Sequence, residues 1–210
     1  MMMPSSRFNI HLMTEDDRIP VLNLLTKSFF HEEPLAKCLQ LGEPMDFANN
    51  VINDTLKDQC SFVGYDIQTN QLAGVCLNKV KYKNDTNTIH EPNEKLNFIL
   101  NLLHHVHKNI NLFDHFLTDS LLYIFMINVD SNYRGYGLAS SLISASIEHA
   151  KKFHIGGAYA EATNIYSLNS FKQQGFQIYD QLNYVEYDHV RLANLTDKSY
   201  DQCQLVARTL

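Results

Sequence analysis

A buried strand that leads through a glycine-bearing turn into a helix is the feature that most restricts how this chain can fold. The apolar run 121–127 is typical of a strand covered on both faces. It ends in a turn that contains Gly135 and Gly137. Apolar residues with helical spacing follow at Leu138, Leu142, Ile143, Ile147 and Ala150. The sequence therefore predicts a strand, a turn and a helix in direct succession.

The turn is predicted to bind a phosphate-bearing ligand. The first N–H groups of a helix lack intrahelical partners, and the helix dipole favours negative charge at that end. Glycines at 135 and 137 remove the Cβ atoms that would hold an anion away. The sequence of residues 134–139 matches neither the G-x-G-x-x-G dinucleotide-binding motif nor a P-loop. A strand–helix turn without a ligand is the alternative that these residues alone leave open.

The composition indicates one globular domain, assigned to residues 1–210. The chain has 45% hydrophobic residues, and 17 basic against 23 acidic residues give a formal charge of −6. No basic run stands out, so neither nucleic acid nor a membrane surface is an expected partner. The four cysteines are scattered, without zinc-site spacing, and are interpreted as free thiols. The N-terminus lacks the apolar core of a signal peptide, and a cytoplasmic monomer is expected.

Periodicity and turn signals predict a mixed α/β (α+β) fold. Strands are expected over 8–13, 60–67, 72–82, 121–129, 158–163, 176–187 and 203–208. Helices are expected from Thr14 to just before Pro34, and over 47–56, 96–106, 138–153 and 167–174. The first helix should present Ile19, Leu22, Leu25 and Phe29 on one face, and 83–93 should form a loop. The segment 121–163 is expected to be a compact strand–helix–strand unit.

Two motifs in the C-terminal half resemble those of GNAT acyltransferases. Arg134-Gly-Tyr-Gly-Leu-Ala139 resembles the R/Q-x-x-G-x-G/A motif with which that superfamily holds the pyrophosphate of acetyl-CoA. The spacing of Asn164, Ser167, Phe171 and Gly175-Phe176 resembles the second signature, a helix beside the cofactor. This resemblance implies a mostly antiparallel central sheet, with a splayed parallel strand pair, flanked by helices.

The N-terminal part is similar to the insect-type arylalkylamine N-acetyltransferase family. Ser28-Phe-Phe-His-Glu-Glu-Pro-Leu35 matches the Phe-Phe-x-x-Glu-Pro-Leu segment of that family. The similarity extends from about residue 10 to residue 188 and is weakest across 80–118. It implies acetyl-CoA-dependent N-acetylation of a small primary amine, with arylalkylamines such as dopamine, tryptamine or serotonin as substrates. It also implies direct transfer in a ternary complex, without a metal.

The resemblance carries over to individual residues. The family's catalytic glutamate falls on Glu33, and its two serines fall on Thr163 and Ser167. Ile165 stands where family members commonly have histidine, which leaves the amine preference open. The residues expected to bind acetyl-CoA are Ile127, Asn128, Val129, Arg134, Gly135, Tyr136, Gly137, Leu138, Ala139, Asn164 and Phe171.

The chemistry of amine acetylation suits these residues, but each also has a plainer interpretation. A glutamate among phenylalanines is desolvated, so its pKa rises toward that of a useful base. A solvated carboxylate at a helix end is the alternative for Glu33, and Glu32 is the reserve candidate. Ser167 and Thr163 could donate to the leaving thiolate, or serve as helix caps. Tyr166 is a candidate acid, and a buried packing residue is the alternative.

The strand before the turn is the expected source of oxyanion stabilisation. In GNAT folds this strand separates from its neighbour, so that N–H groups at 127–129 can bind the thioester oxygen and the pantetheine amides. A fully paired core strand is the alternative. The cluster His104-His105-x-His107 does not suit a metal, because only 104 and 107 share a helix face, and a hydrated helix face is expected instead.

Two other functions are consistent with the same motifs. The first keeps the fold but acetylates polyamines or agmatine, or uses a longer acyl-CoA. The second is a non-catalytic domain that binds acyl-CoA. No serine or cysteine has the strand–turn–helix setting of an acyl-enzyme nucleophile, which favours direct transfer.

Overall fold

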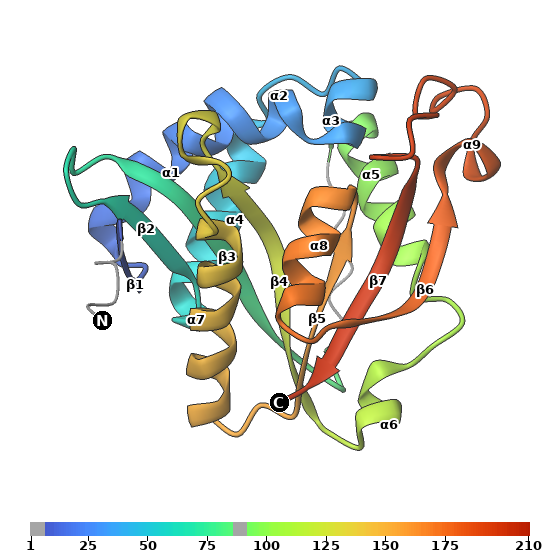
Figure 1. Ribbon diagram of the computed structural model, residues 1–210. Helices are drawn as coiled ribbons and strands as arrows, with labels where there is room; N and C mark the ends of the chain where they lie inside the picture. Colours follow the sequence, from blue (N-terminus) through green and yellow to red (C-terminus); the bar gives the residue numbers. More distant parts are fainter. Residues whose placement is uncertain (1–6, 86–91) are drawn as a thin grey trace.

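The computed structural model describes residues 7–85 and 92–210 of the chain. In this part of the chain, seven strands form one sheet in the order β1-β2-β3-β4-β5-β7-β6 (Figure 1). Neighbouring strands are antiparallel except for the parallel pair β4–β5. The strands are β1 (Phe8–Leu12), β2 (Phe62–Asp66), β3 (Leu72–Tyr82), β4 (Ser120–Val129), β5 (Gly157–Ala162), β6 (Gln177–Asn183) and β7 (Gln202–Thr209). The mixed, mostly antiparallel sheet expected from the sequence is confirmed.

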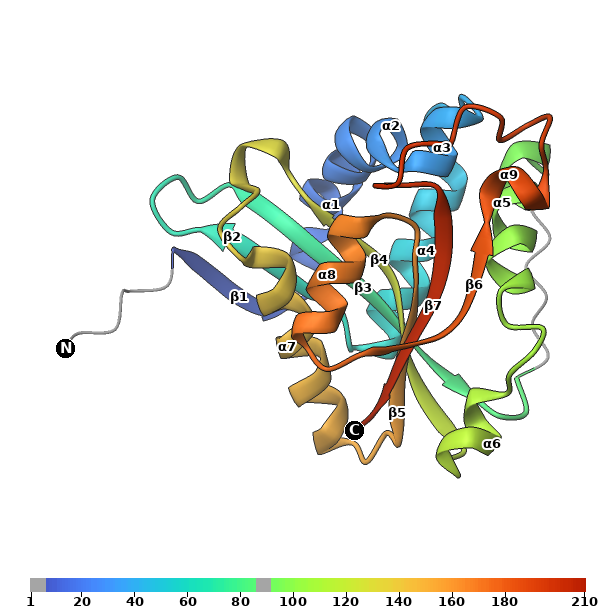
Figure 2. The same ribbon diagram turned by 45° about the vertical axis from the view of Figure 1, so that its right-hand side comes forward.

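Helices cover both faces of this sheet (Figures 1 and 2). They are α1 (Arg18–Leu24), α2 (Phe30–Glu32), α3 (Pro34–Cys38), α4 (Met45–Asp58), α5 (Glu94–His105), α6 (Leu112–Phe116), α7 (Leu138–Lys152), α8 (Ile165–Gln173) and α9 (Tyr184–Tyr187). Two buried clusters lie between the layers, one beneath α1 to α6 and the other beneath α7 and α8. No helix in the described ranges is both long and apolar enough to cross a membrane.

A bulge in the central strand β4 changes which of its side chains point to each face of the sheet. Its register with β3 shifts so that Leu77 pairs with Met126 but Asn78 pairs with Ile124, which leaves Phe125 as the extra residue. As a result, Ile124 packs in the cluster under α7 and α8, whereas Met126 packs in the opposite one. A regular strand would have placed both side chains on the same face.

The parallel strands β4 and β5 separate after a short ladder. They pair only from Leu121 with Gly157 to Tyr123 with Tyr159, although β4 continues to Val129. Figure 2 shows the two strands diverging above this ladder. The splayed pair implied by the resemblance is therefore present, and it leaves one edge of β4 without a strand partner from the bulge to the glycine turn.

The helical segment before the splay contains a π-helical turn. A capping box starts it, in which the backbone N–H of Thr14 donates to the Asp17 carboxylate at 2.8 Å. The turn Leu25–Phe29 joins α1 to α2, and such turns are frequent at functional sites. The break expected at Pro34 is confirmed, because α2 ends at Glu32.

Some of the sequence-based expectations need correction. Proline starts the short helix α3, which the periodicity did not indicate. Ile19 is exposed rather than part of the buried helix face. The strand expected over 176–187 ends at Asn183, whose side chain caps α9 by accepting from the N–H of Glu186. Residues 86–91 of the expected loop lie outside the described ranges.

Candidate active site

A cavity of about 1020 Å³ opens where β4 and β5 separate. Its walls come from the α2–α3 segment, α5, β4, the glycine turn, the end of β5 and α8. Every candidate site residue identified from the sequence lines this cavity except Tyr136. The fold thus brings Glu33 and Phe171, which are 138 positions apart in the sequence, to one cavity.

The glycine turn forms an open cradle at one end of the cavity. Gly135 and Gly137 have φ of +81° and +76°, a conformation that side chains with a Cβ rarely adopt. A Cβ built at either position would have no neighbour within 4 Å. Gly137 is the N-cap of α7 and has no side chain to cap the first turn, and the described residues show no side-chain cap for that helix. The cradle therefore offers free space, amide donors and a helix dipole to an anion.

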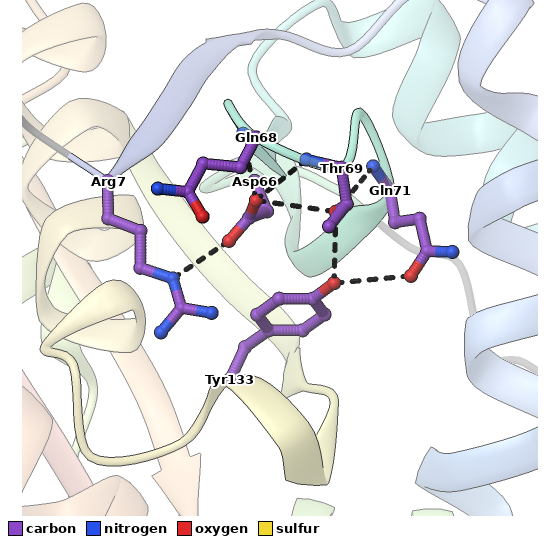
Figure 3. Close-up of polar contacts among 6 residues, drawn as sticks. All are labelled: Arg7, Asp66, Gln68, Thr69, Gln71 and Tyr133. Atoms are coloured by element: carbon purple, nitrogen blue, oxygen red, sulfur yellow. Dashed lines mark hydrogen bonds and ion pairs between the residues drawn. The ribbon is translucent and has the colours of Figure 1, made fainter.

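A polar network fixes the turn to the β2–β3 hairpin (Figure 3). The hydroxyl of the buried Tyr133 donates to Gln71 Oε1 at 3.2 Å and lies 3.3 Å from Thr69 Oγ1. Thr69 in turn donates to the carboxylate of Asp66, which also accepts from Arg7 Nε at 2.8 Å. The Arg7 guanidinium holds the pKa of Asp66 below its usual range. This network connects β1, the hairpin turn and the loop that carries the cradle.

Tyr136 belongs to this supporting structure. The Arg7 guanidinium lies 4.1 Å from the centroid of its ring, and the side chain is exposed outside the cavity. Only the backbone of Tyr136 therefore remains available to a ligand in the cradle. The sequence motif could not distinguish a side chain that contacts a ligand from one that stabilises the turn.

Arg134 spans the mouth of the cavity. Its Nε donates to the carbonyl of Val129 at 2.9 Å, and its guanidinium forms an ion pair with Glu32 on α2. The reserve base Glu32 is thus already engaged by a cation at the surface. Both side chains of this pair are close to half exposed, so the pair is open to exchange with a ligand.

Glu33 lines the cavity, and its carboxylate is buried. It is the N-cap of α3, and its Oε2 accepts from the N–H of Ala36 at 2.7 Å. Its Oε1 is buried and accepts no hydrogen bond from the described residues within normal geometry, although the Thr163 side chain lies near enough to the carboxylate to act on its pKa. Burial raises the pKa of Glu33, against the opposing effects of the Ala36 N–H, the Thr163 side chain and the Leu35 N–H. One oxygen is therefore anchored and the other is free to accept a proton.

The two hydroxyl candidates differ in how they are held. Asn164 caps α8 by accepting from the N–H of Ser167 at 2.9 Å, and Ser167 Oγ donates back to the carbonyl of Asn164 at 3.0 Å. Asn164 is therefore the cap, not Ser167. Thr163 lies beside Glu33, and Tyr184 donates to its carbonyl at 3.1 Å. Tyr166 is exposed at the cavity margin, which excludes the buried packing role that was its alternative.

The open edge of β4 is pinned by a side chain and leaves its backbone accessible. The buried Asn128 accepts from Ser28 Oγ at 3.4 Å and donates to the carbonyl of Leu24 at 3.5 Å. These contacts fix β4 to α1 and the π-helical turn. The neighbouring Ile127 and Val129 line the cavity where β4 has separated from β5.

The acceptor side of the cavity contains residues that sequence reasoning did not identify. Its walls are apolar, with aromatic and aliphatic side chains in similar numbers, and are formed by Phe29, Phe30, Leu35, Phe47, Leu96, Ile99, Leu100, Leu103 and Phe125. Glu161 also lines it and pairs with His107. The hydrated helix face expected for the histidines holds for the exposed His104 but is wrong for His107. No group of His, Cys, Asp or Glu suited to a metal occurs among the described residues.

A comparison of sequences identifies the family. The sequence profile of the acetyltransferase (GNAT) family matches residues 35–176, from the start of α3 to just beyond the end of α8. This chain belongs to that family. The match includes β4, the cradle, α7, β5 and α8, and these elements form most of the cavity.

Solved structures of other proteins share this arrangement along nearly the whole chain. Arylalkylamine N-acetyltransferase 2 from Aedes aegypti superposes with a TM-score of 0.85 at 26% identity, over 96% of this chain and 98% of that one. A Drosophila melanogaster polyamine N-acetyltransferase gives 0.77 at 17% identity, over 97% and 100%. Arabidopsis thaliana Naa50, in complex with a CoA-containing bisubstrate analogue, gives 0.58 at 13%, over 97% and 99%. The last two comparisons concern the fold alone.

Proposed function

We propose that this protein transfers the acetyl group of acetyl-CoA to a small primary amine, with arylalkylamines as the acceptors. The observation that carries this proposal is that Glu33, a buried carboxylate with one unpaired oxygen, lines the same cavity as the uncapped glycine cradle. A proton acceptor and an anion site in one cavity are what a reaction between an ammonium ion and an acyl-CoA requires.

The cofactor would occupy the side of the cavity formed by the cradle and the open edge of β4. The amides at 134–139 would bind its diphosphate, and the space above Gly135 and Gly137 would admit the phosphate oxygens. The pantetheine would lie along the edge of β4 that β5 leaves free, near Ile127 and Val129. Acetyl-CoA supplies the activated acetyl group as a thioester.

The acceptor would occupy the apolar side of the cavity, near Glu33. Aromatic and aliphatic walls favour an amine with a hydrophobic body. The ionisable side chains of Glu32, Glu33, Glu161 and Arg134 line the described cavity, so carboxylates outnumber cations there. Such a balance attracts the ammonium form of an amine from solution.

Glu33 is assigned the role of general base. A free alkylamine is several pK units more basic than a carboxylate, so the ammonium ion passes its proton to Oε1 through ordered water, or the site captures the small neutral fraction of the amine. The neutral nitrogen then attacks the thioester carbon, and backbone N–H groups of β4 stabilise the oxyanion. The C–S bond breaks, the nitrogen gives up its second proton as the amide forms, and the sulfur leaves as a thiolate that takes up a proton. Ser167 and Thr163 are the hydroxyl donors near this step.

A second candidate keeps the reaction and changes the acceptor to agmatine or a polyamine. The buried carboxylate of Glu161 in the cavity wall favours it, because a second cation on the substrate would find a partner there. Release of free thiol from acetyl-CoA, measured across dopamine, tryptamine, histamine, agmatine and spermidine, decides between the two. Calorimetric binding of acetyl-CoA without thiol release from any amine would contradict both and indicate a non-catalytic domain.

We expect kcat to rise with pH and then level off. Burial raises the pKa of Glu33, and the protonated acid cannot act as a base. Activity should therefore be low below this raised pKa and increase as the pH passes through it, while deprotonation of the amine adds to the increase. Steady-state kinetics across about pH 6 to 9 give the test, and a flat profile over that range would contradict base-assisted attack.

A further inference from the structure

Glu161 is a carboxylate in the cavity wall that takes no part in the proton-transfer and acetyl-transfer steps described above. It lies on β5, and its side chain is only 5% exposed. The alternating alanines of this strand pack beneath α7 and α8, namely Ala158, Ala160 and Ala162. The opposite face of β5 therefore presents Glu161 and, two residues later, Thr163 to the cavity.

The position of Glu161 relative to Glu33 follows from this alternation. Thr163 is close enough to Glu33 to affect its pKa. Glu161 is two residues back along the extended chain, a displacement of about 7 Å. Both carboxylates also act electrostatically on the thiol of Cys203, whose pKa is raised mainly by burial. The cavity lining thus contains a second acidic group besides Glu33.

Glu161 is held in place from two sides. His107, just beyond the end of α5, approaches its Oε1 through Nε2 at 2.5 Å. Tyr123, stacked on Tyr159 with centroids 4.6 Å apart, adjoins the same carboxylate. Burial, followed by the charge of Glu161, raises the pKa of Tyr123 well above its usual value. These partners orient the carboxylate, and the described cavity lining contains no lysine and only Arg134, which is paired with Glu32.

We propose that Glu161 is a specificity-determining residue that binds a hydrogen-bond donor on the acceptor, remote from the reacting amine. The preferred acceptors then carry two polar ends, an amine at Glu33 and a second ammonium, guanidinium or hydroxyl group at Glu161. An apolar spacer joins the two polar ends of such an acceptor. The apolar walls bind the spacer itself. This inference rests on the proposed function and specifies its substrate class.

Matched pairs of amines test the proposal. Cadaverine is compared with pentylamine, and tyramine with phenethylamine, because each pair differs only in the remote donor. Wild-type kcat/KM should favour the donor-bearing member of at least one pair by about 10- to 100-fold, as expected for a hydrogen bond to a buried charge. The pair that shows the preference identifies the donor as a cation or as a hydroxyl.

The substitution Glu161→Gln should bring that ratio close to one, while kcat/KM for the amine without the donor stays within a few-fold of wild type. Glu94→Gln, at the exposed first residue of α5, is the matched control and should leave the ratio unchanged. If Glu161 serves only to hold β5 against His107, the substitution would lower kcat/KM equally for both amines of a pair. That result would overturn the proposal. An absence of preference in the wild-type protein would also overturn it.

Two further measurements keep the test decisive. If Glu161→Gln does not fold, Glu161→Asp, which retracts the carboxylate by one methylene, should reduce the ratio in the same direction. Calorimetric titration of the same pairs into the CoA-saturated protein measures the preference without turnover. Equal affinities there would contradict the role of Glu161, whereas unequal affinities with no thiol release would contradict only the proposed transfer reaction.

Discussion

Glu33→Gln is expected to lower kcat by about 10²- to 10⁴-fold and to leave the Kd for acetyl-CoA unchanged. The carboxamide can still accept the N–H of Ala36 through its oxygen, so the cap of α3 is retained. It cannot accept a proton from the amine, because its basicity is negligible at neutral pH. The loss should therefore appear in the chemical step, measured by thiol release at saturating acetyl-CoA, with the Kd measured by calorimetry.

Two variants separate catalysis from folding in this experiment. Glu33→Ala removes the cap as well as the base, so it should show the same loss of kcat and a further destabilisation of about 1 kcal/mol. Glu43→Gln makes the same chemical change in an exposed residue paired with His31 and should behave as wild type. Wild-type turnover in Glu33→Gln would remove Glu33 from the mechanism.

Gly135→Val is expected to abolish measurable acetyl-CoA binding. A Cβ at this position meets no protein atom, so the folded protein has room for the side chain. Its branched carbons would instead fill the space assigned to the diphosphate. The φ of +81° adds local strain of about 1–2 kcal/mol for a residue with a Cβ. Calorimetric titration with CoA measures the affinity, and thermal unfolding measures the strain.

Gly42→Val provides the matched control. Gly42 has a similar φ of +75°, and it too has no neighbour within 4 Å of a built Cβ, but it does not line the cavity. This variant should show a comparable loss of stability and a wild-type affinity for CoA. If both variants lost CoA binding equally, backbone strain would account for the effect, and the cradle would have no support from this experiment.

Local signals were sufficient for the elements that build the cradle. The uninterrupted apolar run of β4, the glycines after it and the 3.6-residue pattern of α7 all lie within about 30 residues, so no distant contact was needed to interpret them. The break at Pro34 followed from the same kind of argument, since the proline ring excludes helical geometry for Glu33. The resemblance then indicated how the parallel strands separate.

The features missed from the sequence depend on tertiary packing. His107 becomes half-buried only because the end of α5 meets β5, and 54 residues separate it from Glu161. The π-helical turn Leu25–Phe29 has no composition that distinguishes it from an ordinary helix. Strand β6 was predicted to continue past its end at Asn183, because an apolar residue such as Tyr184 suits a buried strand as well as a buried helix. In the structure, Tyr184 is the first residue of α9 and is fully buried there.

A crystal structure with CoA and a primary amine bound would show whether main-chain amides of the cradle hold the diphosphate of acetyl-CoA beside Glu33. We expect the diphosphate within hydrogen-bond distance of the amides at 134–139 and the pantetheine along the free edge of β4. We also expect the amine nitrogen to face Glu33 Oε1. A diphosphate bound by side chains elsewhere, with the space above Gly135 and Gly137 empty, would contradict this binding mode.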